Sequence, residues 1–599
     1  MSDADVRELG VGYAGGKVID ELVQRRVEEA DERRLWRGCE IAGHLVRTPD
    51  KVSERSGRLT RLPDKRIAPH TEEIAMARKW WTLLAVSVAT FMLLLDITVV
   101  NTALPSIQKD LSASFTDLQW VIDAYTLTLA AVVLTAGSIA DRIGRRSVFA
   151  GGLAIFSLAS LAAGLAPNAT VLNISRAVQG IGGAAMFAVS LALVAQEFAA
   201  GRERATAMGV YGAVIGAAVA VGPLVGGVVT DALGWRWVFF LNVPIGIAAL
   251  AVTFARLRES RDPNATRVDW LGLVTFSSAL FLLVLGLLRG NDDGWGSATI
   301  VSMFAGSAVM LGAFAAVERR VAEPMLPLGL FRSRAFTGVQ LAAFAVSASL
   351  FALFLYLTLY LQNYLGYSPL QAGLRYLPIT LVPFLVAPLA VALMGRLQAR
   401  VLMAISLVAV GAGLLLMSGL TASSGWTALL PGFLVAGVGI GLLNPVIADV
   451  ALSVVPKERS GMAAGINDTF RQVGVAVGVA VWGAVFLGRG ASKISSLTAG
   501  TPAATGGHPR QLLEAASDGR LGSALSAVPH GARGLVASAT REGFLSGLNS
   551  ILLIGALVAL AGAALALWLV RENQIERDQP EVLATAEDAF EPGELELAA

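Results

Sequence analysis

Long apolar stretches, separated by short polar or Gly/Pro-bounded breaks, fill the chain between residues 80 and 570. A helix needs about 20 apolar residues to cross the roughly 30 Å hydrocarbon core of a bilayer. Cutting the apolar windows at their breaks predicts fourteen spanning helices and an all-α integral membrane protein. The predicted spans are 80–104, 118–140, 148–166, 171–196, 206–230, 235–255, 269–288, 298–317, 336–361, 370–394, 400–420, 427–454, 461–487 and 547–570.

Composition supports this class of protein. Of the 599 residues, 55% are hydrophobic and 15% are charged, against about 25% charged in an ordinary soluble protein. Charges gather at the two ends of the chain, with 31 in residues 1–79 and 11 in residues 571–599. We therefore predict a polar, dispensable cytoplasmic extension over 1–78 and a solvated acidic cytoplasmic tail over 571–599.

Several kinds of chemistry are excluded. A single cysteine, Cys39, rules out an internal disulfide and a cysteine-based metal site, and the four histidines lie outside the apolar segments. The net charge of +2 leaves no basic footprint for nucleic acid. The run from Gly180 to Ala185 imitates a dinucleotide fingerprint, but it lies within a predicted span and indicates close helix packing instead. We expect no metal, no cofactor and no enzyme activity.

Orientation follows from the bias of Lys and Arg toward cytoplasmic loops. Seventeen Lys and Arg residues lie in the short loops on the side of the N-terminus, and three lie in the short loops opposite, namely Lys109, Arg236 and Arg289. We expect a multi-pass protein of the cytoplasmic membrane with both termini inside the cell. The Gly-, Ala- and Ser-rich stretch 489–546 would then be a long, mostly flexible external loop.

Three charged residues stand inside the apolar spans, namely Asp96, Asp123 and Arg176. An ionisable side chain costs about 2.5–3.5 kcal/mol or more in hydrocarbon, so its presence suggests a function. Counting residues from the predicted helix ends places all three at a similar depth in the outer half of the membrane, where they could form one network. We interpret them as proton-coupling and substrate residues; the alternative is a permanent ion pair that only fixes helix packing.

Four other charged residues, Asp449, Asp468, Arg375 and Arg471, lie nearer the ends of their predicted helices. We interpret the first three as interfacial. Arg471 is the exception, because it lies about ten residues inside its helix.

Several segments of residues 80–570 resemble the major facilitator superfamily, and specifically its fourteen-helix drug:proton antiporter family of the QacA and EmrB type. The strongest is LDITVVNTALPSI at 95–107, followed by WVIDAY at 120–125. Arg176 to Gly180 (RAVQG) resembles the fourth-helix motif, whose arginine that family assigns to proton coupling. The resemblance implies a major facilitator fold in a 6+2+6 arrangement, with two pseudo-symmetric six-helix bundles.

Two further motifs belong to the same resemblance. The loop GSIADRIGRR at 137–146 carries the gating-loop residues Gly137, Asp141, Arg142, Gly144, Arg145 and Arg146. We expect its glycines to allow a tight turn and its charges to hold one gate state. The antiporter motif of the fifth helix is formed by Gly222, Pro223, Gly226 and Gly227, with Ala218 where the pattern usually has Gly. Its proline and glycines should admit a close neighbouring helix.

The resemblance implies a six-helix bundle over 79–256, an inserted helix pair over 257–320 and a second bundle over 321–570. It also implies a proton-coupled antiporter that exports drugs or other amphipathic organic compounds. The acids would favour cationic substrates, and the expected partners are the substrate, protons and the lipid bilayer. Alternatives are a dedicated exporter of an endogenous metabolite, lipid or antibiotic, a proton-coupled uptake symporter, and a receptor or passive channel.

Overall fold

The computed structural model describes residues 68–198, 202–261, 268–322, 324–394, 396–455, 460–499 and 508–574. The chain divides into two compact units at Thr71, and only the second unit lies mainly within the described residues. The predictions for the N-terminal extension before residue 68 and for the acidic tail after residue 574 lie outside the described residues.

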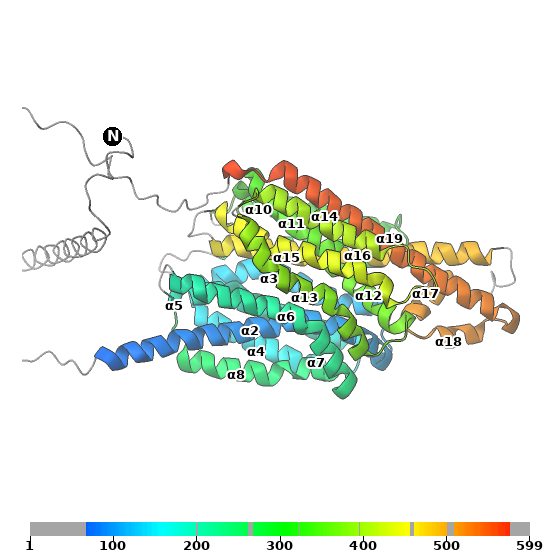
Figure 1. Cartoon of the computed structure of the whole chain (residues 1–599), viewed down its shortest axis with the longest axis horizontal. Coiled ribbons are helices and arrows are strands. Elements are labelled where there is room, and N and C mark those ends of the chain that lie inside the picture. Colours follow the sequence, from blue (N-terminus) through cyan, green and yellow to red (C-terminus); the bar gives the residue numbers. More distant parts are fainter. Residues whose placement is uncertain are drawn as a thin grey trace, which may run out of the picture. The chain divides into compact units, whose positions relative to one another are not determined.

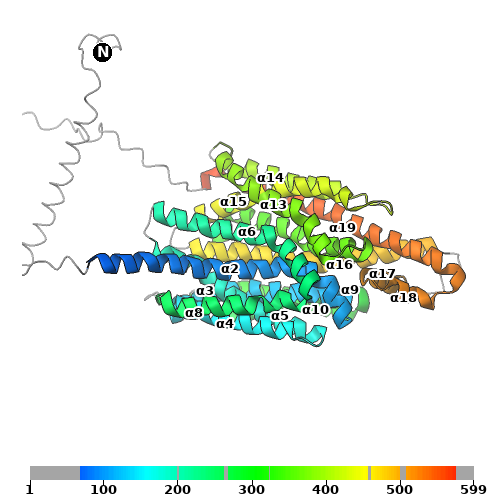
Figure 2. The ribbon, with the colours of Figure 1, turned by 60° about the horizontal axis from the view of Figure 1, so that its bottom comes forward.

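Within the described residues, fourteen helical segments are long and apolar enough to cross a membrane, which confirms the predicted number. They lie side by side in one bundle (Figures 1 and 2). In chain order they are α2 (Ala68–Leu111), α3 (Phe115–Ile143), α4 (Arg145–Gly164), α5 (Ala169–Glu197), α6 (Arg202–Leu233), α7 (Arg236–Phe240) with α8 (Asn242–Arg256), α9 (Trp270–Asp293), α10 (Ala298–Glu318), α11 (Arg334–Ser349) with α12 (Phe354–Leu359), α13 (Pro369–Met394), α14 (Ala399–Met417), α15 (Leu430–Ser453), α16 (Ser460–Thr498) and α19 (Arg533–Leu569).

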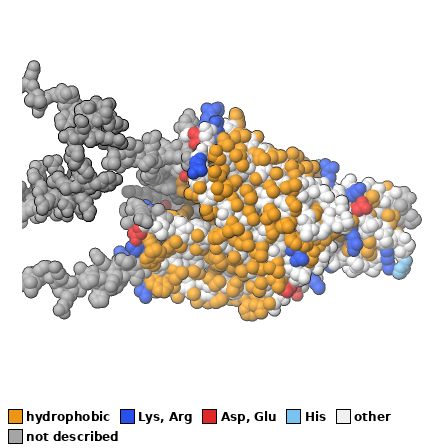
Figure 3. All heavy atoms as spheres, viewed as in Figure 1, with side chains coloured by type: hydrophobic (Ala, Val, Ile, Leu, Met, Phe, Trp, Pro, Cys, Tyr) orange, Lys and Arg blue, Asp and Glu red, His pale blue; other side chains and the backbone are white. Residues whose placement is uncertain are grey.

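The bundle has two ends, which we call proximal and distal. The proximal end is where α2 begins and α19 finishes, and the distal end carries α17 (Pro509–Ser517) and α18 (Leu521–Ala524). Hydrophobic side chains cover the middle of the face shown in Figure 3, and charged side chains gather toward its two ends. Many large apolar side chains of the described residues are exposed, Leu385 at 72% and Leu158 at 67% among them, as expected where lipid replaces water as the solvent.

Local sequence explains where helices meet. The shortest predicted break, between the third and fourth spans, is confirmed. The cause is the N-cap of α5, where the Asn168 side chain accepts a hydrogen bond from the Val171 amide at 3.0 Å. The prediction that small residues permit close packing also holds. A Cβ atom on Gly182 would lie 2.6 Å from the backbone nitrogen of Phe156 and 2.8 Å from the carbonyl oxygen of Gly152.

The ninth span departs from the continuous helix predicted over 336–361. After α11 the chain passes through a 3-10 turn (Phe351–Leu353), α12 and a π-helical turn (Tyr360–Tyr364). The altered winding coincides with polar contacts to other helices. Gln362 donates to the carbonyl of Thr102 at 2.8 Å, and the Tyr356 hydroxyl donates to the carbonyl of Val479 at 2.6 Å.

The expectation of a mostly flexible stretch over 489–546 is wrong for its described residues. Helix α16 continues to Thr498, α19 begins at Arg533, and α17 and α18 lie between them. The Gly and Ser content suggested a linker, but Leu513 is fully buried against Gly490 of α16. Polar contacts fasten α17 at its two ends, because Arg510 pairs with Asp292 of α9 at 2.6 Å and Asp518 accepts a hydrogen bond from Gln108 of α2.

Two carboxyl groups at this docked helix are affected by burial. Burial raises the pKa of Asp518 above its ordinary value of 3.8, although the neighbouring Arg520 acts in the opposite direction. Burial also raises the pKa of Glu514, again opposed by a neighbouring arginine, Arg510. A carboxyl whose pKa is higher in the docked state takes up protons on docking. Docking of α17 is therefore strongest at low pH and weakens as the pH rises through the raised values.

We predict that the backbone amides of 509–517 exchange more slowly with deuterium at about pH 5 than at about pH 8, after correction for the intrinsic exchange rate. Hydrogen-exchange mass spectrometry measures this protection directly. In Asp518→Asn, which keeps an acceptor for Gln108 but cannot ionise, the difference between the two pH values should shrink. Equal corrected protection at both pH values in the wild type would contradict the prediction.

Candidate functional site

The centre of the site is the carboxylate of Asp96, which lies in the apolar middle of α2. Its side chain is inaccessible to solvent, and its Oδ2 atom accepts a hydrogen bond from Arg176 of α5 at 2.5 Å. The Arg176 side chain is only 2% exposed. The structure therefore brings together two of the three predicted residues as a buried ion pair.

Two amide side chains complete the environment of the carboxylate. Gln179 of α5 and Asn242 of α8 both donate to Oδ1 of Asp96, at 2.9 Å and 2.8 Å. Both amides also donate to the hydroxyl oxygen of Ser160 on α4, at 2.9 Å and 3.4 Å. Asp96 thus accepts three hydrogen bonds in a network drawn from α2, α4, α5 and α8, which is how a protein makes a buried charge tolerable.

Arg176 is as fully engaged as its partner. Its Nε donates to the carbonyl of Val121 on α3 at 3.0 Å, and its Nη1 also donates to the side-chain oxygen of Gln179 at 2.6 Å. The guanidinium lies over the ring of Tyr125, 4.2 Å from its centroid, a distance at which the ring face attracts a cation. The arginine therefore ties α3 into the same network.

Asp123 does not join this network, so the expected three-residue cluster is wrong for this residue. Its side chain is fully buried on α3, yet neither carboxyl oxygen has a hydrogen-bond partner among the described residues. One turn earlier on the helix, Gln119 donates to the Tyr356 hydroxyl at 3.2 Å and to the carbonyl of Val479 on α16 at 3.0 Å. Asp123 is therefore an unpaired acid on the helix that packs against α12 and α16.

A second charged group lies on α16, where Asp468 interacts electrostatically with Arg471. The Nη1 atom of Arg471 donates to the side-chain oxygen of Asn444 on α15 at 3.2 Å. Both charged side chains keep some exposed surface. The separation of three residues between acid and base places both on one helix face.

Arg375 agrees better with the interfacial interpretation. It lies in the second turn of α13, at the distal end, and its guanidinium lies 3.6 Å from the centroid of the Tyr367 ring and 5.3 Å from that of Trp426. Asp449 has an interaction partner in the structure.

The gating-loop motif forms its turn at Gly144 alone, which has a φ angle of +126° between α3 and α4. Gly137 lies inside α3 instead, with open space where a side chain would be. Asp141 pairs with Arg145 at 2.9 Å, as expected, whereas Arg142 is exposed and has no ion pair among the described residues.

A residue outside the motif completes the loop. The carboxylate of Glu259, just after α8, accepts hydrogen bonds from the backbone amides of Arg146 and Ser147 at 3.0 Å and 3.1 Å. It also pairs with the Arg146 side chain at 3.8 Å. An acid at the first turn of α4 satisfies free amides and complements the helix dipole. Sequence reasoning missed Glu259 because it lies 113 residues after Arg146.

The fifth-helix motif lies where α6 touches two other helices, as its glycines predicted. A Cβ atom on Gly226 would lie 2.7 Å from the carbonyl oxygen of Val99 on α2, and one on Gly227 would lie 2.6 Å from that of Pro369 on α13. A Cβ atom on Gly222 would collide with the Thr98 side chain of α2. One on Gly373 of α13 would collide with the carbonyl of Pro223. The motif thus lets α6 approach α2 and α13 at backbone distance.

The fold, the buried pair and these motifs define a membrane transport protein built from packed helices. The sequence pattern of the Major Facilitator Superfamily matches residues 86–479. This chain belongs to that superfamily of membrane transporters, which are not enzymes, and it is a multi-pass membrane protein.

The chain is similar to several curated antibiotic-resistance proteins. It is 39% identical over 433 residues to the puromycin resistance protein of Streptomyces alboniger, covering 72% of this chain and 86% of that protein. It is 33% identical to the tetracenomycin C resistance and export protein of Streptomyces glaucescens, covering 86% and 95%. It is 36% identical to the multidrug resistance protein Stp of Mycobacterium tuberculosis, covering 67% and 75%.

Among solved structures, the chain resembles a bacterial homologue of the human lysosomal transporter Spinster in an inward-facing, unoccupied conformation. The TM-score is 0.58 at 17% identity, over 84% of this chain and 99% of that one. At this identity the likeness concerns the fold, and it confirms the predicted major facilitator fold.

The first prediction from the site concerns stability. Asp96→Asn removes the charge that compensates Arg176, and breaking a buried ion pair typically costs about 3–5 kcal/mol. Asp123→Asn removes no ion pair or hydrogen bond. Thermal unfolding of the purified variants, followed by fluorescence-detected size exclusion, should show a clearly larger loss of stability for Asp96→Asn. Equal unfolding temperatures for the two variants would show that the pair does not hold the bundle together.

The second prediction concerns the antiporter motif. Gly227→Val places a branched side chain against the backbone of α13, so we expect little monodisperse protein, since forcing extra atoms into a packed contact costs about 1–3 kcal/mol or more. Gly212→Val is the matched control on the same helix, because a Cβ atom there meets nothing within 4 Å. Size-exclusion profiles of the two variants measure the difference. Wild-type yield of Gly227→Val would disprove the close approach.

Proposed function

We propose that this chain is a proton-coupled antiporter that exports amphipathic, preferentially cationic, organic compounds across the cytoplasmic membrane. The observation that carries the proposal is a fully buried acid, Asp123, with no partner among the described residues, on a helix that packs against α16. The chain's relatives include proteins named for drug resistance and for resistance and export. The proton gradient supplies about 2.3 kcal/mol per charge at 100 mV and about 1.4 kcal/mol per pH unit.

The two acids have different roles in this proposal. Asp96 keeps its charge against Arg176 and orders the first bundle. Asp123 exchanges a proton with the medium, because an unpaired carboxylate is costly where no donor satisfies it. A cationic substrate can compensate the charge of Asp123 once the proton has left. Proton and substrate would then compete for one site, which is the basis of exchange transport.

Transport requires parts that move against each other. We propose that residues 79–256 and 321–570 form the two halves, with residues 257–320 as an inserted pair, and that the halves rock about their contacts. Contacts between the two proposed halves include two toward the distal end, where Gln362 binds the Thr102 carbonyl and Gln119 binds the Val479 carbonyl. These bonds must break when the distal side opens.

The same proposal includes the orientation in the membrane. The bias of Lys and Arg toward the proximal loops supports a cytoplasmic proximal end, with both termini inside the cell. The distal end, with α17 and α18, then faces outward.

A dedicated exporter of one antibiotic is the second candidate function. Similar chains include a probable actinorhodin transporter of Streptomyces coelicolor and the cephamycin export protein of Amycolatopsis lactamdurans. Such a protein would share the proton chemistry and differ in its range of substrates. A panel of unrelated compounds in one transport assay separates the two candidates.

We predict that inverted membrane vesicles containing the chain accumulate ethidium or puromycin when respiration energises them, and that an uncoupler abolishes the accumulation. Asp123→Asn should reduce transport to the level of vesicles without the protein. Asp231→Asn, an exposed acid near the distal end of α6, is the matched control and should transport normally. Full activity of Asp123→Asn would refute the proposed proton carrier, and expulsion from inverted vesicles would indicate an uptake symporter.

A further inference from the structure

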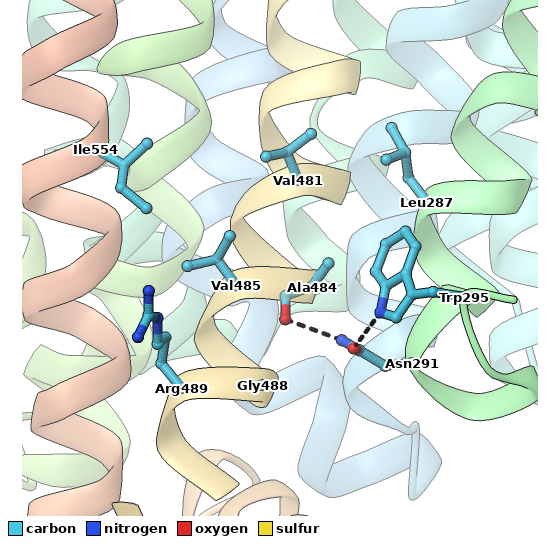
Figure 4. A pocket seen from close by; sticks show the side chains of 9 residues that line it. All are labelled: Leu287, Asn291, Trp295, Val481, Ala484, Val485, Gly488, Arg489 and Ile554. Carbon is cyan, nitrogen blue, oxygen red and sulfur yellow. Dashed lines mark hydrogen bonds between the residues drawn. The ribbon is translucent and has the colours of Figure 1, made fainter. Parts of the chain in front are cut away.

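A groove at the distal end of the bundle is not used by the proposed transport cycle. It lies between α9, α16 and α19 and has a volume of about 370 Å³ (Figure 4). Its walls are apolar over most of their length, formed by Leu287 of α9, Val481 and Val485 of α16, and Ile554 of α19. Exposed apolar side chains continue beyond the groove on the same helices, including Phe281 and Leu553. The groove therefore opens within the lipid-facing surface.

The polar groups in the wall are already satisfied by one another. The Asn291 amide donates to the carbonyl of Ala484 at 2.9 Å, and the Trp295 indole donates to the side-chain oxygen of Asn291 at 3.0 Å (Figure 4). These bonds join α9 to α16 and engage both side chains within the protein. The half-exposed Trp295 ring borders the groove, as tryptophan does where membranes meet water.

One charged residue lines the groove, and it is Arg489 of α16. Its side chain is exposed, and it makes no ion pair or hydrogen bond with the part of the chain that the structure describes. The neighbouring acids are occupied elsewhere, because Asp292 pairs with Arg510, Asp293 with Arg289, and Glu542 with Lys493 at 4.0 Å. The groove thus combines an apolar slot with one uncompensated cation at its polar end.

We propose that this groove binds one phospholipid with an anionic head group, its acyl chain in the apolar slot and its phosphate on Arg489. Guanidinium groups bind phosphate oxygens through charge-assisted hydrogen bonds. The cation argues against a passage for cationic substrates, which it would repel. A lipid with a net negative charge should bind more tightly than a zwitterionic lipid, because the cationic group of a zwitterionic head group competes with Arg489 for the phosphate. The bound lipid would fill the seam between α9 and the helices α16 and α19.

Native mass spectrometry of the purified full chain tests this proposal. Delipidated protein is titrated with phosphatidylglycerol or phosphatidylcholine of identical acyl chains. We expect the wild type to retain phosphatidylglycerol about fivefold more tightly and Arg489→Gln to lose this preference. Arg289→Gln is the matched control, because Arg289 lies on α9 beside the groove but is paired with Asp293. It should keep the preference.

Two further measurements test the apolar part of the site. Val485→Trp fills the slot and should lower retention of phosphatidylglycerol in protein that remains monodisperse. Glycerol 3-phosphate, which has the phosphate but no acyl chain, should not displace the lipid. Equal retention of the two lipids by the wild type, a preference that survives Arg489→Gln, unchanged binding by Val485→Trp, or displacement by glycerol 3-phosphate would each overturn the proposal.

Discussion

The buried carboxylate of Asp96 is the constraint around which helices α2, α5 and α8 are organised. A charge at this depth is tolerated only if donors surround it, and here Arg176, Gln179 and Asn242 supply them. Because these partners come from α5 and α8, one side chain links both helices to α2. Arg176 extends the same constraint to α3 through the Val121 carbonyl. Hydrocarbon-facing helices have no water-driven force to hold them together, so such a polar network contributes specificity that apolar packing does not.

Asp123 on α3 shows the opposite arrangement. It is as deeply buried as Asp96, yet no described side chain or amide binds its carboxyl oxygens. The nearby contacts of Gln119 with Tyr356 and Val479 cross to the second set of helices. In the proposed cycle, Asp96 stays paired and stabilises one half. Asp123, which has no partner among the described residues, binds and releases protons and substrate. Asp468 and Arg471 add a second charged group on α16, from the opposite half.

Sequence patterns predicted the helices well and the polar contacts only in part. The length of an apolar segment shows directly whether it can cross a membrane, so all fourteen spans are predictable, including the short break that contains Asn168. Depth along a helix could be counted, but the direction of a side chain around the helix axis could not. For this reason Asp123 was grouped with Asp96 and Arg176, although it faces other helices. Glu259 and the docked helix α17 depend on partners far along the chain, which local composition does not reveal.

Substrate-induced proton release is the most direct test of the central claim, that Asp123 exchanges its proton for substrate. Purified protein in weakly buffered detergent solution is mixed with ethidium, and the pH change is followed with an indicator dye. The account predicts that the wild type releases protons when ethidium binds, and that Asp123→Asn releases none while Asp231→Asn behaves like the wild type. Undiminished proton release from Asp123→Asn would contradict it.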